Sequence, residues 1–232
     1  MEQEARKYLE KDRLLHIGML ESLRLHEAEI LYAGEDGVLI RHTIADIHMF
    51  SAASENSAEK ISCMIKDPSV ILIHQNEYKA WMMDRFSLLN TMPCHQAAWL
   101  KDESVPAIPS DADIRLLSDA DLPIVLHYYH AVDGPEYVKE RLKAGMLGIY
   151  VEGELGGFIG THPEGSIGLL EILPAFRRQG LAMVLESAMM QRQQSLSRVP
   201  YAHIKQGNEA SIALHKKLGM EVTEEASLCW LY

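Results

Sequence analysis

The chain has 232 residues, of which 47% are hydrophobic and 24% charged, and this composition is typical of a globular protein with one large or two small domains. Its formal net charge of −11 argues against general nucleic-acid binding and favours cationic substrates such as amines. No apolar run approaches the ~20 residues of a membrane-spanning helix, and the three cysteines lack the spacing of a disulfide framework or a zinc site. Because the N-terminal segment is also too polar for a signal peptide, we expect a cytoplasmic protein with no metal and no membrane partner.

The first hundred residues alternate between helical and strand-like patterns, separated by turn residues. In chain order we expect a helix over Glu2–Leu25 that is broken near Gly18, strands over Glu29–Tyr32, Val38–Thr43 and Ala45–Ser51, a helix over Ser57–Lys66, a strand over Val70–His74, a helix over Glu77–Phe86 and a strand over Pro93–Leu100. Residues 101–113 are charged and contain two prolines, which is typical of a linker.

The rest of the chain repeats this order of elements. We expect a strand over Ile114–Leu117, helices over Asp119–Ala131 and Pro135–Ala144, strands over Leu147–Glu152 and Leu155–His162 joined by a hairpin turn at Gly153, a strand over Ile167–Leu173, a helix from near Gln179, a strand over Val199–Lys205, a helix after Asn208 and a terminal strand through Trp230.

The junction between the strand at Ile167–Leu173 and the next helix is the most informative segment. The strand is almost wholly apolar, as expected of a strand covered on both faces, and Pro174 ends it. Apolar residues at positions 181, 184, 185, 188 and 189 then form a helical stripe. The first N–H groups of such a helix have no intrahelical partner, and together with the helix dipole they form an anion site.

The loop between this strand and helix has the residues that a phosphate needs. Gly180 allows a pyrophosphate to approach the backbone, and Arg177 and Arg178 add positive charge and forked donors. The alternative is an ordinary strand-to-helix turn with two solvated arginines.

A second motif follows the strand at Val199–Lys205. Asn208 is a good N-cap, and Gly219 lies where a left-handed C-terminal cap is expected. The helix between them has a buried stripe of apolar residues at Ala210, Ala213, Leu214 and Leu218.

The two motifs, LLEILPAFRRQGLA and NEASIALHKKLGM, resemble the acyl-CoA-binding segments of the GNAT superfamily of N-acetyltransferases, and are most similar to its glycine N-acyltransferase-like branch. The resemblance runs from about Ile114 to the C-terminus and implies an α/β fold with a splayed mixed sheet. It implies that a bulge on the motif strand opens a cleft for CoA, that backbone groups of Ile172 and Leu173 position the thioester, and that Asn208 contacts the pantetheine arm. The residues implied around the pyrophosphate are Arg177, Arg178, Gln179, Gly180, Leu181 and Ala182.

The chain departs from the family pattern at two catalytic positions. Many relatives have a tyrosine seven residues after the asparagine as acid to the departing thiolate, and His215 stands there. Some relatives have a glutamate early on the motif strand as general base. No carboxylate occupies the matching place near Ser166, and Glu164 and Glu171 are the nearest candidates. Glu171 could instead be structurally paired or face solvent at a bulge, and His215 could be an exposed surface histidine.

The repeated element order suggests that the first half is a degenerate GNAT-like copy. We therefore expect such a domain over residues 1–100, a linker over 101–113 and the acyltransferase domain over 114–232. The loop matching the phosphate site would be Phe50–Asn56, which has no glycine and no basic residue, and Glu55 would repel phosphate. This half is not expected to bind CoA.

These features predict an acyl-CoA-dependent N-acyltransferase. The acyl donor is expected to be acetyl-CoA, a co-substrate, and the acceptor the amine of a small molecule or amino acid, bound together in a ternary complex. His215 would serve as the acid and Glu171 as the base. The alternative is a non-catalytic CoA-binding or protein-interaction module on a GNAT fold; a homodimer is left open.

Overall fold

The computed structural model describes residues 1–130 and 134–232, and it shows an α/β protein built on mixed β-sheet. The chain divides into two compact units, and each is described by itself. The first unit contains Met1–Ala98, His203–His215 and Met220–Tyr232, and the second contains Trp99–Ala202 and Lys216–Gly219.

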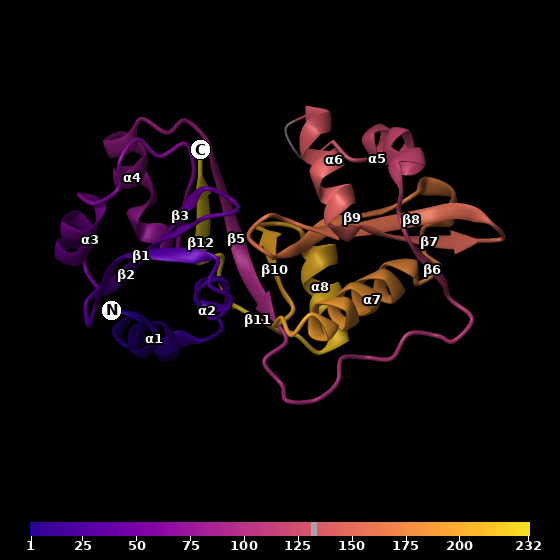
Figure 1. The fold of residues 1–232 in the computed structure, drawn as a ribbon, viewed down its shortest axis with the longest axis horizontal. Coiled ribbons are helices and arrows are strands. Elements are labelled where there is room, and N and C mark those ends of the chain that lie inside the picture. Colours follow the sequence, from indigo (N-terminus) through magenta and orange to yellow (C-terminus); the bar gives the residue numbers. More distant parts are fainter. Residues whose placement is uncertain (131–133) are drawn as a thin grey trace. The chain divides into compact units, whose positions relative to one another are not determined.

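The first unit is a sheet with helices on both faces (Figure 1). Its strands are β1 (Ala28–Gly34), β2 (Gly37–His42), β3 (Ile47–Ala52), β4 (Ile71–Ile73), β5 (Thr91–Ala98), β11 (Glu221–Val222) and β12 (Leu228–Leu231). Its helices are α1 (Glu2–Leu9), α2 (Ile17–Arg24), α3 (Glu55–Ser62) and α4 (Lys79–Phe86), with 3-10 turns η1 (Glu10–Asp12) and η2 (Asn76–Tyr78). The strand order is β1-β2-β3-β4-β12-β5; β3 and β4 are parallel, and the other neighbouring pairs are antiparallel.

Alternation along the strands gives this sheet two apolar faces. Met49 belongs to the core cluster that contains residues of α1 and α2, whereas Phe50 belongs to the cluster that contains residues of α3 and α4. Leu72 and Ile73 divide in the same way. Successive side chains of a strand point to opposite faces, so the apolar runs predicted as strands bury both sides.

The last strand of the chain lies in the first unit. Trp230 of β12 pairs with Leu72 of β4 on one side and with Met92 of β5 on the other, both antiparallel. The expected domains, with residues 114–232 as one acyltransferase domain, stay a prediction. The interpretation of each half as a GNAT copy stays a prediction.

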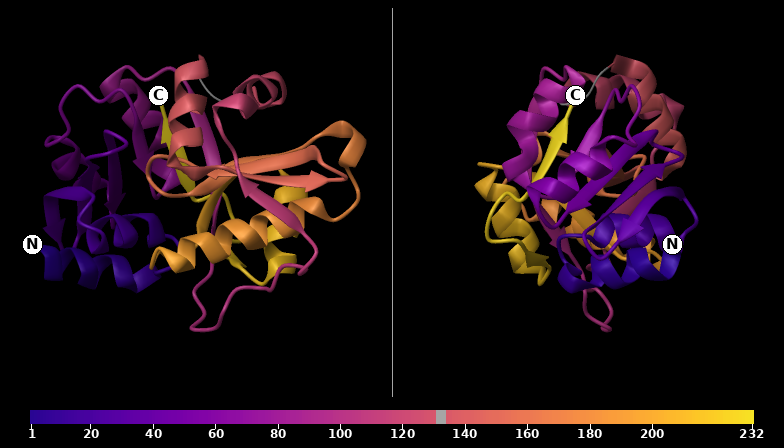
Figure 2. Two further views of the ribbon diagram at one scale, coloured as in Figure 1. Left: turned by 45° about the vertical axis from the view of Figure 1, so that its right-hand side comes forward. Right: turned by 90° about the vertical axis from the view of Figure 1, so that its left-hand side faces the viewer.

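The second unit has the strand order β9-β8-β7-β6, with antiparallel neighbours. Helices α5 and α6 cover one face of these strands, and α7 covers the other (Figures 1 and 2). The elements are β6 (Asp113–Leu116), η3 (Asp119–Asp121), α5 (Leu122–Tyr128), α6 (Gly134–Gly145), β7 (Leu147–Val151), β8 (Glu154–Thr161), β9 (Ile167–Ile172), η4 (Pro174–Phe176) and α7 (Leu181–Ser195).

Strand β10 (Tyr201–Lys205) and helix α8 (Glu209–Leu218) each have residues in both units. Within the second unit, Ala202 of β10 pairs in parallel with Ile167, the first residue of β9. The strands predicted over Ile167–Leu173 and Val199–Lys205 are thus neighbours near the points where both begin.

Local signals placed most elements within a few residues of their observed bounds. The β7–β8 hairpin turns through Glu152 and Gly153, both with positive φ, as in the mirror-image turns that two-residue hairpins favour. Two helices differ from expectation. The first helix ends at Leu9 and the next begins at Ile17, so the break comes before the expected one at Gly18. The helix predicted over Asp119–Ala131 is a 3-10 turn followed by α5, and Ala131 lies outside the described residues.

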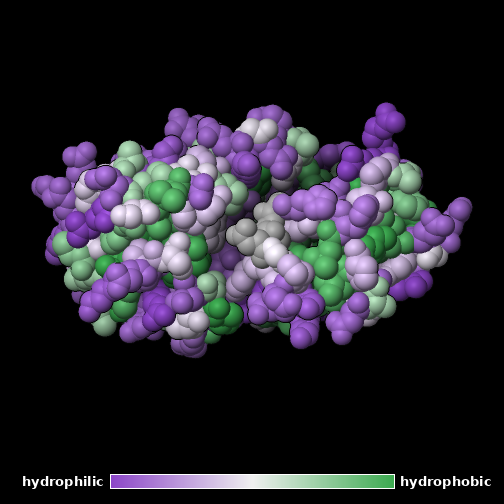
Figure 3. All heavy atoms as spheres, turned by 90° about the horizontal axis from the view of Figure 1, so that it is seen from above, coloured by the Kyte–Doolittle hydropathy of each residue, from purple (hydrophilic) through white to green (hydrophobic). Residues whose placement is uncertain are grey.

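The surface is polar with scattered apolar side chains. On the face in Figure 3, hydrophilic residues predominate and apolar ones lie among them. Single exposed apolar residues are ordinary on soluble surfaces. None of the described helices is long and apolar enough to cross a membrane. The most exposed large apolar side chains besides the terminal ones are Ile44, Met64, Leu89, Leu116 and Leu196.

Candidate functional site

The loop after β9 turns sharply before α7 begins. Pro174 opens the 3-10 turn η4, in which the Phe176 N–H donates to the Leu173 carbonyl oxygen at 2.9 Å. Arg178 and Gly180 both have left-handed backbone conformations, with φ of 62° and 80°. Gly180 is the N-cap, so the helix begins at Leu181, slightly later than the expected start near Gln179.

The N-terminus of α7 is open to a ligand. Gly180 provides no side-chain cap, and residues 177–180 are exposed. A Cβ atom built on Gly180 would have no neighbouring heavy atom within 4 Å. Within the described part of the chain, the N–H groups of residues 177–182 have no backbone acceptor. The loop therefore combines free donors, the positive end of a helix dipole and empty space, which together suit a phosphate group.

The two arginines of the loop differ in their contacts. The Arg177 guanidinium donates through Nη2 to Glu171 Oε1 at 2.9 Å and through Nε to the Ile172 carbonyl oxygen at 3.0 Å. Arg178 is exposed. Glu171 is thus structurally paired, one of the two alternatives to a catalytic role considered above. An anion that used Arg177 would have to compete with a carboxylate of its own protein.

Strand β9 carries a bulge. Phe158 pairs with Glu171 and Gly160 with Gly168, so β9 has one residue more than β8 over this stretch. Leu169 lies in the extra segment with φ of 52°, a left-handed conformation that a non-glycine residue adopts only where its surroundings impose it. Beyond the bulge, the Leu173 N–H donates to the Gly156 carbonyl oxygen at 2.9 Å.

His215 belongs to α8, and Asn208 directly before the helix caps it. Asn208 Oδ1 accepts from the Ser211 N–H at 3.2 Å, as the sequence predicts. His215 is only 4% exposed, so it is not the surface histidine of the alternative interpretation. Its Nδ1 lies 2.7 Å from the Ser211 carbonyl oxygen, which requires a proton on Nδ1. The neutral ring is then an acceptor at Nε2, and it acts as an acid only after taking a second proton.

A polar cluster lies on the α6 side of the second unit. The Tyr137 hydroxyl and His162 Nδ1 are 2.5 Å apart, and the buried Glu164 accepts from the Ser166 hydroxyl. Burial lowers the pKa of His162 below its usual value, although the Glu164 charge opposes this effect. Burial also raises the pKa of Tyr129 to about 12, with a smaller contribution from the charge of Glu171.

Sequence reasoning missed His162 because nothing local distinguishes it. It was placed at the end of a predicted strand, and its partner Tyr137 is 25 residues away. The available signal was weak: His162 ends one predicted strand and Gly168 lies near the start of the next, so a ring could lie across the neighbouring strand if the two pair.

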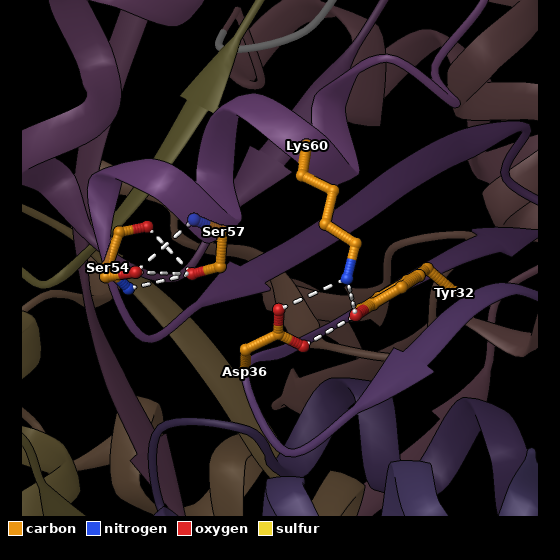
Figure 4. Close-up of polar contacts among 5 residues, drawn as sticks. All are labelled: Tyr32, Asp36, Ser54, Ser57 and Lys60. Carbon is orange, nitrogen blue, oxygen red and sulfur yellow. Dashed lines mark hydrogen bonds and ion pairs between the residues drawn. The ribbon is translucent and has the colours of Figure 1, made fainter.

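The first unit has a different helix N-terminus at the expected counterpart of this loop. Ser54 caps α3: Ser54 Oγ accepts from the Ser57 N–H at 3.3 Å, and Ser57 Oγ accepts from the Ser54 N–H at 2.9 Å (Figure 4). At the start of α3, backbone N–H groups thus donate to side-chain oxygens, whereas at the start of α7 they have no such acceptor among the described residues.

A cavity of about 550 Å³ lies beside α3 and α4 in the first unit. Its two basic groups already have partners. Lys60 contacts the Tyr32 hydroxyl at 2.8 Å and Asp36 at 3.5 Å (Figure 4), and Arg85 donates to the Cys63 sulfur at 3.3 Å. The cavity thus lacks an unengaged cation for a phosphate. It is lined by Asn56, Glu59, Lys60, Cys63, Trp81 and Arg85.

Among the described residues, no group of three or more histidine, cysteine, aspartate or glutamate side chains could hold a metal ion.

Comparison with known proteins identifies the fold. Residues 146–231 match the family model described as FR47-like protein. No curated protein sequence matches the chain. Among solved structures, a Drosophila protein aligns with a TM-score of 0.65 at 19% identity, covering 84% of this chain and 73% of that one.

Two bacterial structures cover nearly the whole chain. A protein from Novosphingobium aromaticivorans, assigned to the GNAT family of acetyltransferases, aligns with a TM-score of 0.54 at 17% identity and covers 95% of this chain and 96% of its own. A GCN5-related N-acetyltransferase from Kribbella flavida aligns with a TM-score of 0.53 at 14% identity and covers 94% of each chain. At these identities the likeness concerns the fold alone, and the fold of this chain is that of the GNAT acetyltransferases.

Proposed function

We propose that the chain is an acyl-CoA-dependent N-acyltransferase of the glycine N-acyltransferase-like type. It transfers an acyl group, most simply acetyl, to the amine of a small molecule or amino acid within a ternary complex. The observation that carries this proposal is the open loop before α7, where unpaired N–H groups, the space at Gly180 and two arginines meet. The GNAT fold and the capped helix at Asn208 support it.

The loop suits the pyrophosphate of CoA. Leu181 and Ala182 begin α7, so the helix fixes their N–H groups and binding an anion there requires little reorganisation. Arg178 is free to add charge, whereas Arg177 would first exchange the Glu171 carboxylate for phosphate. Backbone groups of Ile172 and Leu173 would then position the thioester, with Asn208 on the pantetheine arm.

Acetyl-CoA supplies an activated acyl group, and the chain has to supply orientation and proton transfer. An alkylamine with pKa near 10.4 is mostly protonated at pH 7, and removing that proton costs roughly 4 to 5 kcal/mol. The neutral amine then forms the C–N bond at the acyl carbon, the C–S bond breaks, and the thiolate takes a proton. His215 is our candidate for that last proton donor, and alignment of amine and thioester supplies much of the remaining rate.

The N-terminal half, residues 1–100, is proposed not to bind CoA. The Ser54–Ser57 capping box occupies donors at the start of α3, and Glu55 in the first turn would repel phosphate. Its proposed role is structural.

The rival function is a CoA-binding module without catalysis. One observation favours it: Glu171, the expected base, is held in an ion pair with Arg177. The two functions differ in whether bound acyl-CoA is consumed.

Release of CoA thiol separates them. The protein is incubated with acetyl-CoA and, one at a time, glycine, glutamine, lysine, tryptamine and putrescine, and thiol is followed with a chromogenic disulfide. Amine-dependent release that is lost in Gly180→Glu supports the enzyme. Saturable CoA binding by calorimetry with no release for any amine supports the module, and the absence of both refutes the proposal.

A further inference from the structure

The proposed reaction needs a group that accepts a proton from the amine, and both carboxylates expected for this role are engaged. Glu171 pairs with Arg177 at 2.9 Å. Glu164 is 5% exposed and accepts a hydrogen bond from the Ser166 hydroxyl. Either carboxylate would have to give up its present contact before it could take a proton from the amine.

His162 lies against the motif strand at the place where a carboxylate is lacking. It follows directly on β8, its N–H donates to the Ser166 carbonyl oxygen at 2.8 Å, and Thr161 before it pairs with Ile167. A Cβ atom at Gly168 would lie only 2.3 Å from His162 Nε2, so the ring covers this glycine. Any larger residue at 168 would displace the imidazole. His162 Nε2 therefore lies against Gly168 of β9, the residue that precedes Leu169 in the bulge.

The other ring nitrogen is held from the opposite side. Tyr137 on α6 brings its hydroxyl to 2.5 Å from His162 Nδ1. Burial raises the pKa of Tyr137, so the phenol stays protonated at neutral pH. It can donate to Nδ1 or accept from Nδ1–H, and the base proposed below requires the second arrangement. With the proton on Nδ1, the lone pair of the neutral ring is on Nε2, the atom that lies over Gly168.

We propose that His162 is the general base of the acyl transfer and that Tyr137 is the residue that positions its ring. Nε2 accepts one proton from the substrate ammonium, and the freed amine forms the C–N bond to the acyl carbon. The CoA thiolate takes its proton from His215 as the C–S bond breaks, the second proton of the attacking nitrogen replaces the one that His215 gave, and His162 is left protonated. The imidazolium then releases its proton to water, so amide, CoA thiol and one proton balance the reaction. The inference rests on the proposed function.

The charges around the ring suit a base that cycles between neutral and protonated forms. Glu164 favours the imidazolium, Arg141 of α6 opposes it, and burial keeps the ring neutral before the substrate arrives. A purely structural histidine would need the Tyr137 contact, but its replacement would not alter how turnover depends on pH.

The test compares His162→Asn with His26→Asn. Asparagine retains a polar group that can bond the Tyr137 hydroxyl but has no basic nitrogen. His26 is an exposed histidine of the first unit with φ of 58°, which asparagine tolerates. We expect His162→Asn to lower kcat about 10²- to 10⁴-fold, near the usual range for losing an acid–base group. The acid limb of its kcat–pH profile should disappear while the Kd of CoA stays within about twofold, and His26→Asn should match the wild type.

Gly168→Ala tests the geometry independently of the base. Its methyl group must push the ring away, so kcat should fall, and Gly168→Ala combined with His162→Asn should lose little more than His162→Asn alone. Tyr137→Phe should lower kcat less than His162→Asn does and should move the acid limb of the kcat–pH profile.

Wild-type kcat and an unchanged acid limb in His162→Asn, with the protein folded by circular dichroism, would overturn the inference but leave the proposed function intact. If wild-type protein releases no CoA thiol with any amine, the proposed function itself fails.

Discussion

Replacing Gly180 by glutamate separates the phosphate loop from an ordinary turn. Gly180 has φ of 80° and open space where a Cβ would stand, so the side chain fits but the backbone is strained. For an L-residue this strain costs about 1–2 kcal/mol. At roughly 2–4 °C per kcal/mol for a chain of this size, the melting temperature should fall by a few degrees and the fold should survive.

The effect on CoA binding should be much larger than the effect on stability. A carboxylate about 6 Å from one phosphate charge, at an effective dielectric constant of about 20, raises the binding free energy by about 3 kcal/mol. At 1.4 kcal/mol per tenfold, this is a loss of about 100-fold in affinity. Because the loop is exposed, added salt should reduce the loss.

Two controls isolate the charge. Gly180→Ala introduces the same strain without a carboxylate and should keep most of the affinity. Gly153→Glu lies in the β7–β8 turn, where φ is 86° and a Cβ would also have no neighbour within 4 Å. It should lose similar stability and bind CoA as the wild type does. Titration calorimetry and thermal unfolding of the four proteins give both quantities, and equal CoA affinity for Gly180→Glu and the wild type would refute the phosphate site.

Further expectations concern stoichiometry, catalysis and pH. One CoA should bind per chain and, at a concentration a hundredfold above Kd, stabilise the fold by about 2.7 kcal/mol; two per chain in calorimetry would contradict the proposal that residues 1–100 do not bind CoA. His215→Phe should lower turnover by about 10- to 1,000-fold with little change in the Kd of acetyl-CoA, and unchanged turnover would make this histidine a bystander. Glu171→Gln should tighten CoA binding because it releases Arg177, whereas Arg177→Ala should weaken it; a weaker Glu171→Gln complex would argue against the competition. Burial lowers the pKa of His16 and His74, whose rings lie 5.4 Å apart in the first unit. The unfolded chain therefore binds more protons, and the free energy of unfolding should fall as pH drops below about 6.5, by up to 1.4 kcal/mol per unit for each histidine. Urea unfolding at pH 7.5 and 5.5 measures this, and His74→Gln should reduce the slope.

The strand, loop and helix of the proposed phosphate site could be predicted from the sequence because their signals are local. Pro174 ends one element, Gly180 permits a left-handed cap, and the apolar stripe after it predicts the helix that is observed as α7. The cap at Asn208 is local in the same sense, since Asn208 Oδ1 contacts the N–H only three residues away.

Only the tertiary structure decided which distant groups meet. Nothing in the pattern of β12 says that it lies between β4 and β5, because an apolar strand can pair with many edges and packing selects among them. The pairing of Arg177 with Glu171 depends on how the loop folds back onto β9. The approach of His162 to Gly168 and Tyr137 needs the hairpin register and the position of α6 together, and neither is encoded within any short segment.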